Sequence, residues 1–265
     1  MFGGSGFYEL LAEDSPGVER IELPTPFGPP SAPITLASIG GRRVAFLPRH
    51  GLEHQFAPAA IPARANLWAM RTLGVRIVIG PCAAGSLARE VHPGDFVVLD
   101  QLVDRTWGRA DTFYDAGLPH HVSYAEPYCP VVSRLAVSAG DREGITVHGR
   151  GTVVVIPGPR FSTRAESRWY RAQGWEVVNM TQYPEAYLAR ELGMHYAGIA
   201  LITDYDTGVV DDPSIEPVTQ DQVFGFFENN VHRVRALLMQ LIPTLPEEPL
   251  SCGCADAIGP LHAYE

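Results

Sequence analysis

Short apolar runs alternate with longer amphipathic stretches along most of the chain. Each short run is almost continuously apolar, which is typical of strands that are covered on both faces of a sheet. The predicted strands are Arg76–Gly80, Phe96–Leu99, Thr152–Ile156, Glu176–Asn179 and Ala197–Thr203. The longer stretches repeat apolar residues with helical spacing. The predicted helices are Pro62–Leu73, Ser167–Gln173, Pro184–Leu192 and Gln220–Leu241.

This alternation predicts one α/β domain with a largely parallel central sheet, because strand–helix–strand units bring successive strands side by side. The chain shows no linker and no internal repeat, so the domain is predicted to span residues 1–243. The periodic pattern is absent from residues 244–265, which are predicted to form a tail. Asp104–Pro130 lacks helical or strand periodicity and is predicted to be a long functional loop. A glycine turn begins at Gly3, so we expect the first strand to be missing or very short, with nothing before the turn to pair.

The composition excludes several classes of partner and chemistry. Of 265 residues, 20 are basic and 30 are acidic, a net charge of −10, and a chain this acidic lacks the basic footprint of a nucleic-acid-binding protein. All of the basic residues are arginine. Lysine Schiff-base chemistry and the lysine of a Walker phosphate loop are therefore excluded. Arginine and histidine are left as the charged side chains for anion recognition.

Targeting, membrane and metal signals are weak. No apolar run approaches the roughly 20 residues of a membrane span, and no leader pattern opens the chain, so we expect a cytoplasmic protein with reduced thiols. Cys82 and Cys129 lie in apolar surroundings and are predicted to be core thiols. Cys252 and Cys254 form a single C-x-C, which is half a metal site. His50–His54 matches an H-x-x-E-H pattern, but neighbouring proline and glycine residues break the helix it requires. We therefore expect no metal.

Polar or small residues follow several of the predicted strands. Because ligands of open α/β sheets gather at the carboxyl ends of strands, these positions predict one pocket with an anion end and an acid end. The positions are Arg49–His50, Ala83–Leu87, Thr181 and the carboxylates Asp204 and Asp206, together with the glycine turn around Ser5. Each has a simpler interpretation, which is a solvated loop pair, a helix cap or a turn without a ligand.

Longer motifs run from Gly3 to about Pro243. They include Leu47-Pro-Arg-His-Gly, Asp100-Gln-Leu-Val-Asp-Arg-Thr, Ala125-Glu-Pro-Tyr-Cys-Pro, Gly158-Pro-Arg-Phe-Ser-Thr-Arg-Ala-Glu-Ser, Asn179-Met-Thr, Pro184-Glu-Ala and Thr203-Asp-Tyr-Asp. With these motifs the chain resembles the trimeric class of purine nucleoside phosphorylases, and within it the enzymes that act on 5′-methylthioadenosine. The resemblance implies a single α/β domain whose central mixed sheet is partly closed into a barrel and flanked by helices. It also implies a homotrimer with active sites near subunit boundaries.

The implied reaction is phosphorolysis of 5′-methylthioadenosine to adenine and 5-methylthioribose 1-phosphate. Its partners are inorganic phosphate and a purine nucleoside, and it needs no metal or organic cofactor. The functional residues of the family are assigned to the matching positions of this chain. The resemblance implies phosphate binding by Ser5, Arg49, His50, Ala83 and Thr181, ribose contact by Met180, a base pocket lined by Phe161, purine recognition and catalysis by Asp204 and Asp206, and a 5′ contact from His121 of a neighbouring subunit.

Asp204 also bears on the choice of base. A 6-aminopurine offers a donor that a carboxylate accepts, whereas oxo-specific relatives carry asparagine at this position, so adenine nucleosides are favoured. Cys82 stands where relatives often carry threonine beside the phosphate, which predicts weaker phosphate binding. Other substrates remain open, namely 5′-deoxy- or 5′-halo-5′-deoxyadenosine and 6-oxopurine nucleosides. The rival functions are a hydrolytic nucleosidase and a non-catalytic purine-binding protein.

Overall fold

The fold is built on two sheets, which a computed structural model describes for residues 1–3, 17–117, 119–207, 209, 218–247 and 250–260. The larger sheet has seven strands in the order β7-β9-β10-β5-β11-β6-β8. These are β7 (Gln101–Asp104), β9 (Thr152–Val155), β10 (Val177–Asn179), β5 (Ile77–Ser86), β11 (His195–Tyr205), β6 (Phe96–Val98) and β8 (Val147–His148). The sheet curls into a half-barrel, as the family resemblance implied.

The pairing in this sheet is mixed. β5 and β11 run parallel through its centre, whereas β10 pairs antiparallel with β5, and β6 pairs antiparallel with β11. The remaining neighbours are parallel. The sheet is thus less uniformly parallel than strand–helix alternation predicts. No helix lies between β5 and β6, so the chain turns back and β6 runs antiparallel to β11.

The smaller sheet has the order β1-β4-β3-β2. Its strands are β1 (Phe2–Gly3), β4 (Arg42–Pro48), β3 (Ile34–Ile39) and β2 (Glu19–Ile21). The first strand is very short, as expected, but the expectation that nothing precedes the glycine turn to pair is wrong. Phe2 pairs with Leu47, and Gly3 with Pro48, in parallel register. Phe2 is fully buried, and the N–H groups of Leu47 and Arg49 donate to Met1 O and Gly3 O, so packing and hydrogen bonds together hold this strand against β4.

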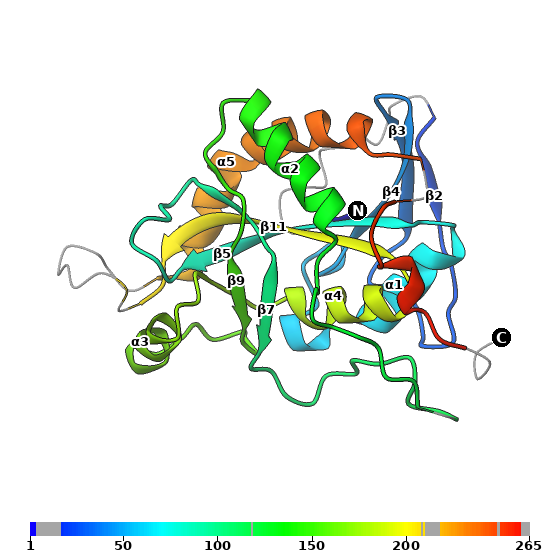
Figure 1. The fold of residues 1–265 in the computed structure, drawn as a ribbon, viewed down its shortest axis with the longest axis horizontal. Coiled ribbons are helices and arrows are strands. Elements are labelled where there is room, and N and C mark those ends of the chain that lie inside the picture. The colour runs from blue at the N-terminus through cyan, green and yellow to red at the C-terminus, as the bar shows by residue number, and fades with distance from the viewer. Residues whose placement is uncertain (4–16, 118, 208, 210–217, 248–249, 261–265) are drawn as a thin grey trace.

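Helices cover both faces of the half-barrel (Figure 1). α2 (Pro130–Arg142) and α5 (Gln220–Leu241) lie on one side of β5 and β11, while α1 (Ala63–Thr72) and α4 (Gln182–Glu191) lie on the other. α3 (Arg164–Ala172) begins with the capping box of Thr163 and Glu166 that its sequence predicts. Short 3₁₀ turns lie at Pro58–Ala60, Ile242–Thr244 and Ala255–Ala257. No helix in the described part of the chain combines the length and apolarity needed to cross a bilayer.

Each predicted helix and strand is present, but two strands are longer than predicted. β5 continues to Ser86 and β11 to Tyr205, so Ala83 and Asp204 lie within strands and not after them. α5 has the predicted bounds. α2 was not predicted, because its β-branched residues and Gly140 weaken a helical pattern. Gly140 is needed there, since a Cβ would come within 2.1 Å of a Val147 methyl group on β8. The loop predicted between Asp104 and Pro130 holds no helix or strand at residues 105–117 and 119–129.

The tail also packs against the domain. Leu250, Cys252 and the buried Cys254 form a small apolar cluster with Cys129 and Ala197. Cys129 is fully buried, as its prediction as a core thiol requires. The tail thus contacts both the segment that precedes α2 and the start of β11.

Candidate active site

One cavity lies where β4, β5, β10 and β11 end. It collects most of the predicted site residues, namely Arg49, His50, Ala83, Phe161, Met180, Thr181, Asp204 and Asp206. Cys82, expected to be a core thiol, is buried and also lines this cavity. Ser5 lies outside the described residues. The sheet thus brings together positions that are more than 150 residues apart in the chain.

A β-bulge positions Asp204. In the β5–β11 pair, Ile202 lies opposite Ala84 and Asp204 lies opposite Gly85, so Thr203 is an extra residue on β11. A bulge changes the direction in which the following side chain points. Gly85 leaves room for it, because a Cβ there would lie 3.1 Å from a carboxylate oxygen of Asp204. The carboxyl group is thereby held at the cavity wall.

The environment of Asp204 favours its protonated form. Burial, together with the nearby Asp206, raises the pKa of Asp204 from 3.8 to about 7. The Thr203 hydroxyl opposes this shift by donating to Asp204 Oδ1 at 2.7 Å. A carboxyl group with a pKa near neutrality can either donate or accept a proton under physiological conditions.

Asp206 lies deeper, with only 3% of its surface exposed. Its backbone N–H donates to Ser86 O at 2.9 Å, which fixes the residue against the end of β5. Burial raises the pKa of Asp206, and the hydroxyl groups of Ser167 and Ser162 partly offset that shift. The two carboxyl groups therefore share one wall of the cavity in different surroundings.

Arg49 is held by a partner that the sequence analysis did not identify. Its Nε and one terminal nitrogen donate to both carboxylate oxygens of Glu185, at 2.7 and 3.0 Å, and its other terminal nitrogen donates to Pro81 O at 2.7 Å. Tyr196 also donates to Glu185, at 2.8 Å. Burial acts to lower the pKa of Arg49, but the Glu185 carboxylate more than compensates and keeps it above its usual value. Three of the five guanidinium N–H groups are thus committed within the protein.

His50 is neutral in this environment. Burial lowers the pKa of His50 to about 4, and the adjacent Arg49 and His54 act in the same direction. Nδ1 lies 2.9 Å from the Phe56 carbonyl oxygen. Because a carbonyl can only accept, Nδ1 carries the proton and Nε2 of the neutral ring is an acceptor. The ring stacks on His54, with the centroids 4.3 Å apart.

Asn179 organises the region around Thr181. Its Oδ1 accepts from the backbone N–H groups of Thr181 and Gln182, at 2.7 and 2.8 Å. Its Nδ2 donates to Ala83 O at 3.1 Å, which connects the end of β10 to β5. Asn179 belongs to a motif noted in the sequence, but this bridging role depends on a strand that lies about 100 residues earlier.

α5 supplies a wall that the sequence analysis did not predict. Gln220, Val223, Phe224 and Phe227 from its first two turns line the cavity. Phe224 packs edge-on against His54, with the ring centroids 5.6 Å apart. The helix itself was predicted, but periodicity does not reveal which part of an apolar face covers a cavity rather than the core.

His121 does not join this cavity in the single chain. It is exposed and lines a second hollow with the tyrosines Tyr124, Tyr183 and Tyr187. Its predicted position beside the 5′ end of a nucleoside is thus not reached within one subunit.

Comparison with known proteins agrees with this geometry. Residues 2–243 match the model of the phosphorylase superfamily. The chain belongs to the phosphorylase superfamily. It is 50% identical to the S-methyl-5′-thioadenosine phosphorylase of Mycolicibacterium smegmatis, over all of this chain and 98% of that protein. It is 47% identical to the purine nucleoside phosphorylase of Streptomyces coelicolor, over 98% of this chain and 93% of that protein.

Solved structures of the phosphorylase superfamily have the same fold. A methylthioadenosine phosphorylase from Schistosoma mansoni in complex with adenine matches with a TM-score of 0.88 and 35% identity. The alignment covers 99% of this chain and 95% of that one. A methylthioadenosine phosphorylase from an antarctic soil metagenomic library matches with a TM-score of 0.87 and 36% identity, over 100% of this chain and 93% of that one. The family resemblance identified from the sequence motifs is therefore confirmed across nearly the whole chain.

Proposed function

We propose that the protein catalyses phosphorolysis of 5′-methylthioadenosine, giving adenine and 5-methylthioribose 1-phosphate. The observation that carries the proposal is Asp204, a carboxyl group with a pKa of about 7 at the wall of the cavity that also holds Arg49, His50 and Thr181. The relatives named above support the choice of nucleoside, since one is a phosphorylase of methylthioadenosine at 50% identity. The protein is thus a pentosyltransferase.

Asp204 acts on the purine. As the glycosidic bond breaks, electrons move into the base and positive charge builds on the ribose. A protonated Asp204 that donates to N7 stabilises this leaving group, and the pKa near 7 keeps a large share of the carboxyl protonated at neutral pH. Asp206 lies in the same wall, Phe161 lines the base pocket, and Met180 packs on the ribose.

Phosphate binds at the end of the cavity formed by Arg49, His50, Ala83 and Thr181, with Ser5 as a further donor. Glu185 orients the guanidinium of Arg49, whose remaining N–H groups face the anion. The neutral His50 ring accepts from a protonated phosphate oxygen through Nε2, which fits a pKa of about 4. The bound phosphate then lies beneath C1′ as nucleophile and counter-charge. These side chains and the two substrates supply every step.

The part of the cavity that α5 covers is suited to an apolar substituent at the 5′ position of the nucleoside. Val223, Phe224 and Phe227 of α5 form an apolar wall, which favours a methylthio group over a hydroxyl because a buried hydroxyl needs a hydrogen-bond partner. His121 reaches this end from a neighbouring subunit. The 5′ pocket is completed only in an oligomer.

We further infer a homotrimer in the cytoplasm. The long loop carries Trp107, which is 80% exposed, and the exposed His121 lies 14 residues later. A large exposed aromatic side chain on such a loop is typical of a surface that packs against another subunit. The net charge of −10 argues against nucleic-acid partners.

A broader purine nucleoside phosphorylase is the second candidate. The Streptomyces coelicolor relative, at 47% identity, carries that name. While the protonated oxygen of Asp204 donates to N7, its carbonyl oxygen accepts from the 6-amino group, whereas a 6-oxopurine would face that oxygen with a lone pair, so adenine nucleosides are preferred. The 5′-deoxy- and 5′-halo-5′-deoxyadenosines fit the same apolar wall.

The decisive experiment incubates the protein with 5′-methylthioadenosine, with and without phosphate, and follows adenine and the sugar product by chromatography. We expect adenine release that depends on phosphate and yields the sugar 1-phosphate. Equal release in both buffers would mean a hydrolytic nucleosidase, and binding without release would mean a purine-binding protein. Inosine and 5′-deoxyadenosine, assayed in parallel, rank the alternative substrates.

A further inference from the structure

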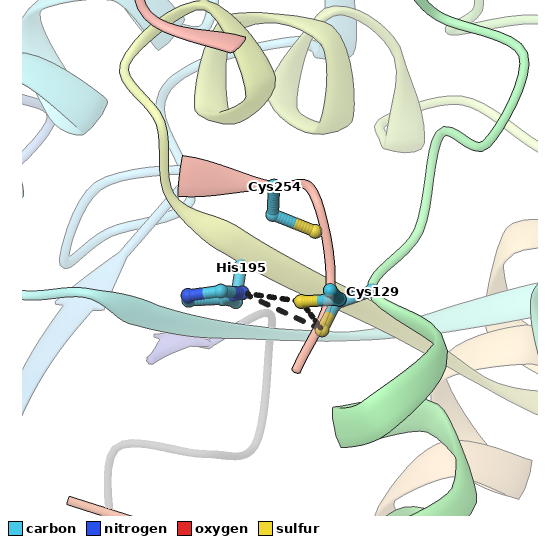
Figure 2. A group of neighbouring side chains, drawn as sticks. Cys129, His195 and Cys254 are labelled. Atoms are coloured by element: carbon cyan, nitrogen blue, oxygen red, sulfur yellow. Dashed lines mark hydrogen bonds between the residues drawn. The ribbon is translucent and has the colours of Figure 1, made fainter. Parts of the chain in front are cut away.

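Four metal-binding side chains meet away from the cavity. The C-x-C pair Cys252 and Cys254 of the tail lies beside Cys129 and His195, which come from the residue before α2 and the first residue of β11. All four ligand atoms lie within 4.8 Å of one another. Figure 2 shows the labelled side chains of Cys129, His195 and Cys254 gathered between these segments. The pair that was half a site in the sequence thus acquires two further donors.

The separations among the ligand atoms of Cys129, His195 and Cys252 are close to those of tetrahedral coordination. Cys129 Sγ lies 3.6 Å from Cys252 Sγ and 3.6 Å from His195 Nδ1, and Cys252 Sγ lies 3.2 Å from the same nitrogen. Zinc–sulfur bonds of about 2.3 Å and zinc–nitrogen bonds of about 2.0–2.1 Å place tetrahedral ligand atoms roughly 3.5–3.8 Å apart. The sulfur–sulfur separation is also well beyond the roughly 2.05 Å of a disulfide.

The fold fixes the backbone of each ligand residue. The Cys129 N–H donates to Tyr196 O at 2.8 Å, and the His195 N–H donates to Arg76 O at 2.8 Å. In the tail, the Cys252 N–H donates to Leu250 O at 2.9 Å, and Cys254 immediately precedes the 3₁₀ turn Ala255–Ala257. Cys129, His195 and Cys254 are each at most 2% exposed. Such positions hold thiols and an imidazole in place before a metal arrives.

We propose that Cys129, His195, Cys252 and Cys254 form a structural zinc site of the Cys₃His type. Three sulfur donors and one imidazole nitrogen select zinc over calcium or magnesium, which prefer oxygen ligands. On binding, three Zn–S bonds form while three thiol protons leave to solvent, and the neutral imidazole contributes a lone pair from Nδ1. Four protein ligands leave no open coordination position, so the metal has a structural and not a catalytic role.

The site connects the tail to the long loop. Just beyond the C-x-C pair, Gly259 N donates to the Tyr114 hydroxyl at 2.7 Å, and the His120 ring lies 3.3 Å from Ala257 O. The rings of Tyr114 and His120 also pack together, with centroids 5.0 Å apart. The metal therefore anchors a tail that contacts the residues next to His121.

The first test measures the metal content of the full chain purified under reducing conditions. After reconstitution with zinc and removal of excess metal, mass spectrometry of the metal should give about one zinc per chain. The double variant Cys252→Ser/Cys254→Ser should lose it. Cys82→Ala is the matched control, because Cys82 is the cysteine outside the cluster and its removal should leave the metal content unchanged.

The second test reads the ligand set directly and does not depend on a variant that folds. Cobalt(II) added to the metal-free chain should produce a sulfur-to-cobalt charge-transfer band and the intense visible bands of a tetrahedral ion, and zinc should abolish both. Zinc should also raise the melting temperature of the chain and of Cys82→Ala. A zinc content well below one per chain, weak octahedral cobalt bands or a disulfide among these cysteines in the reduced protein would overturn the proposal.

Discussion

Asp204 owes its chemistry to one extra residue in β11. Without the bulge at Thr203, β11 would keep its register with β5, and the residue opposite Gly85 would change. Burial then moves the pKa of this carboxyl into the neutral range. The resulting group combines the two properties of a general acid, a position at the cavity and a proton available at working pH.

Replacing Asp204 should therefore impair turnover and change base preference. Asp204→Asn is expected to lower kcat/KM for 5′-methylthioadenosine by about 10²-fold or more, the usual contribution of a general acid. Since an amide can donate to a 6-oxo group, the ratio of inosine to adenosine activity should rise. Steady-state kinetics with both nucleosides checks this. An unchanged ratio of inosine to adenosine activity would contradict the assignment of Asp204 to the base pocket.

The pKa of Asp204 also predicts the pH dependence of the enzyme. In the proposed mechanism the reactive form is protonated, so kcat/KM for the nucleoside at saturating phosphate should fall as pH rises through about 7. Folding stability changes in the same direction. The pKa is raised on folding from 3.8, so the stabilising contribution of the carboxyl is full below about pH 4 and is lost as pH approaches 7.

Asp204→Asn is the control for both measurements. Both proteins use the same phosphate substrate, so its ionisation affects both pH profiles equally. A fall in kcat/KM near pH 7 that is present in the parent and absent from the variant therefore belongs to Asp204. Parallel profiles for the two proteins would assign the pH dependence to another group.

At the scale of elements, the pair formed by Arg49 and Glu185 joins β4 to α4. Each side chain is at most 2% exposed, and the guanidinium donates to both carboxylate oxygens. Neither the arginine after β4 nor the glutamate of α4 would be buried without the other, because an unpaired buried ion costs several kcal/mol. The pair therefore holds the end of β4 against α4 and also orients the guanidinium at the proposed phosphate site.

Arg49→Ala should accordingly affect both stability and phosphate binding. Leaving the Glu185 carboxylate buried and unpaired is expected to lower the free energy of unfolding by about 3–5 kcal/mol, measured by urea denaturation at fixed protein concentration. The KM for phosphate should rise more than the KM for the nucleoside, because the guanidinium binds the anion.

A control lies on the same strand. Arg43 is exposed on β4, so Arg43→Ala should change the free energy of unfolding by no more than about 0.5 kcal/mol. An equal loss of stability in both variants, or equal effects of Arg49→Ala on both KM values, would contradict the role assigned to this pair.

At the scale of the whole molecule, the proposed function predicts a 5′ pocket that a second subunit completes. His121 lies outside the cavity of its own chain, on the exposed loop that also carries Trp107. His121→Ala should lower kcat/KM for 5′-methylthioadenosine by about tenfold, which corresponds to the loss of one contact of roughly 1.4 kcal/mol. Light scattering should show a trimer for both proteins.

Subunit mixing distinguishes a shared site from a local effect. When His121→Ala and Asp204→Asn proteins are dissociated mildly and reassembled in equal amounts, about one quarter of the sites should combine an intact Asp204 with a neighbour's intact His121. Activity should then exceed that of either parent. No recovery despite proven exchange, or a fully active monomer, would contradict the shared site.

The local sequence pattern was enough to predict much of this structure. The bounds of α5, the capping box of α3 and the buried strands β9 and β10 follow from periodicity and capping residues, since these depend on burial within a few turns of chain. The polar groups at strand ends correctly indicated one cavity, because strand ends of one sheet lie together. The family was also identifiable, since its motifs are continuous in the chain.

Tertiary structure alone decided the rest. The partner of Arg49 lies 136 residues away, and the cluster of three cysteines and His195 joins three segments that lie 57 to 125 positions apart. The bulge at Thr203 exists only in register with β5. Periodicity records that a side chain is buried but not which distant surface covers it. For that reason the sequence determined the elements and the family, while packing determined which charges pair, where Asp204 points and which thiols meet.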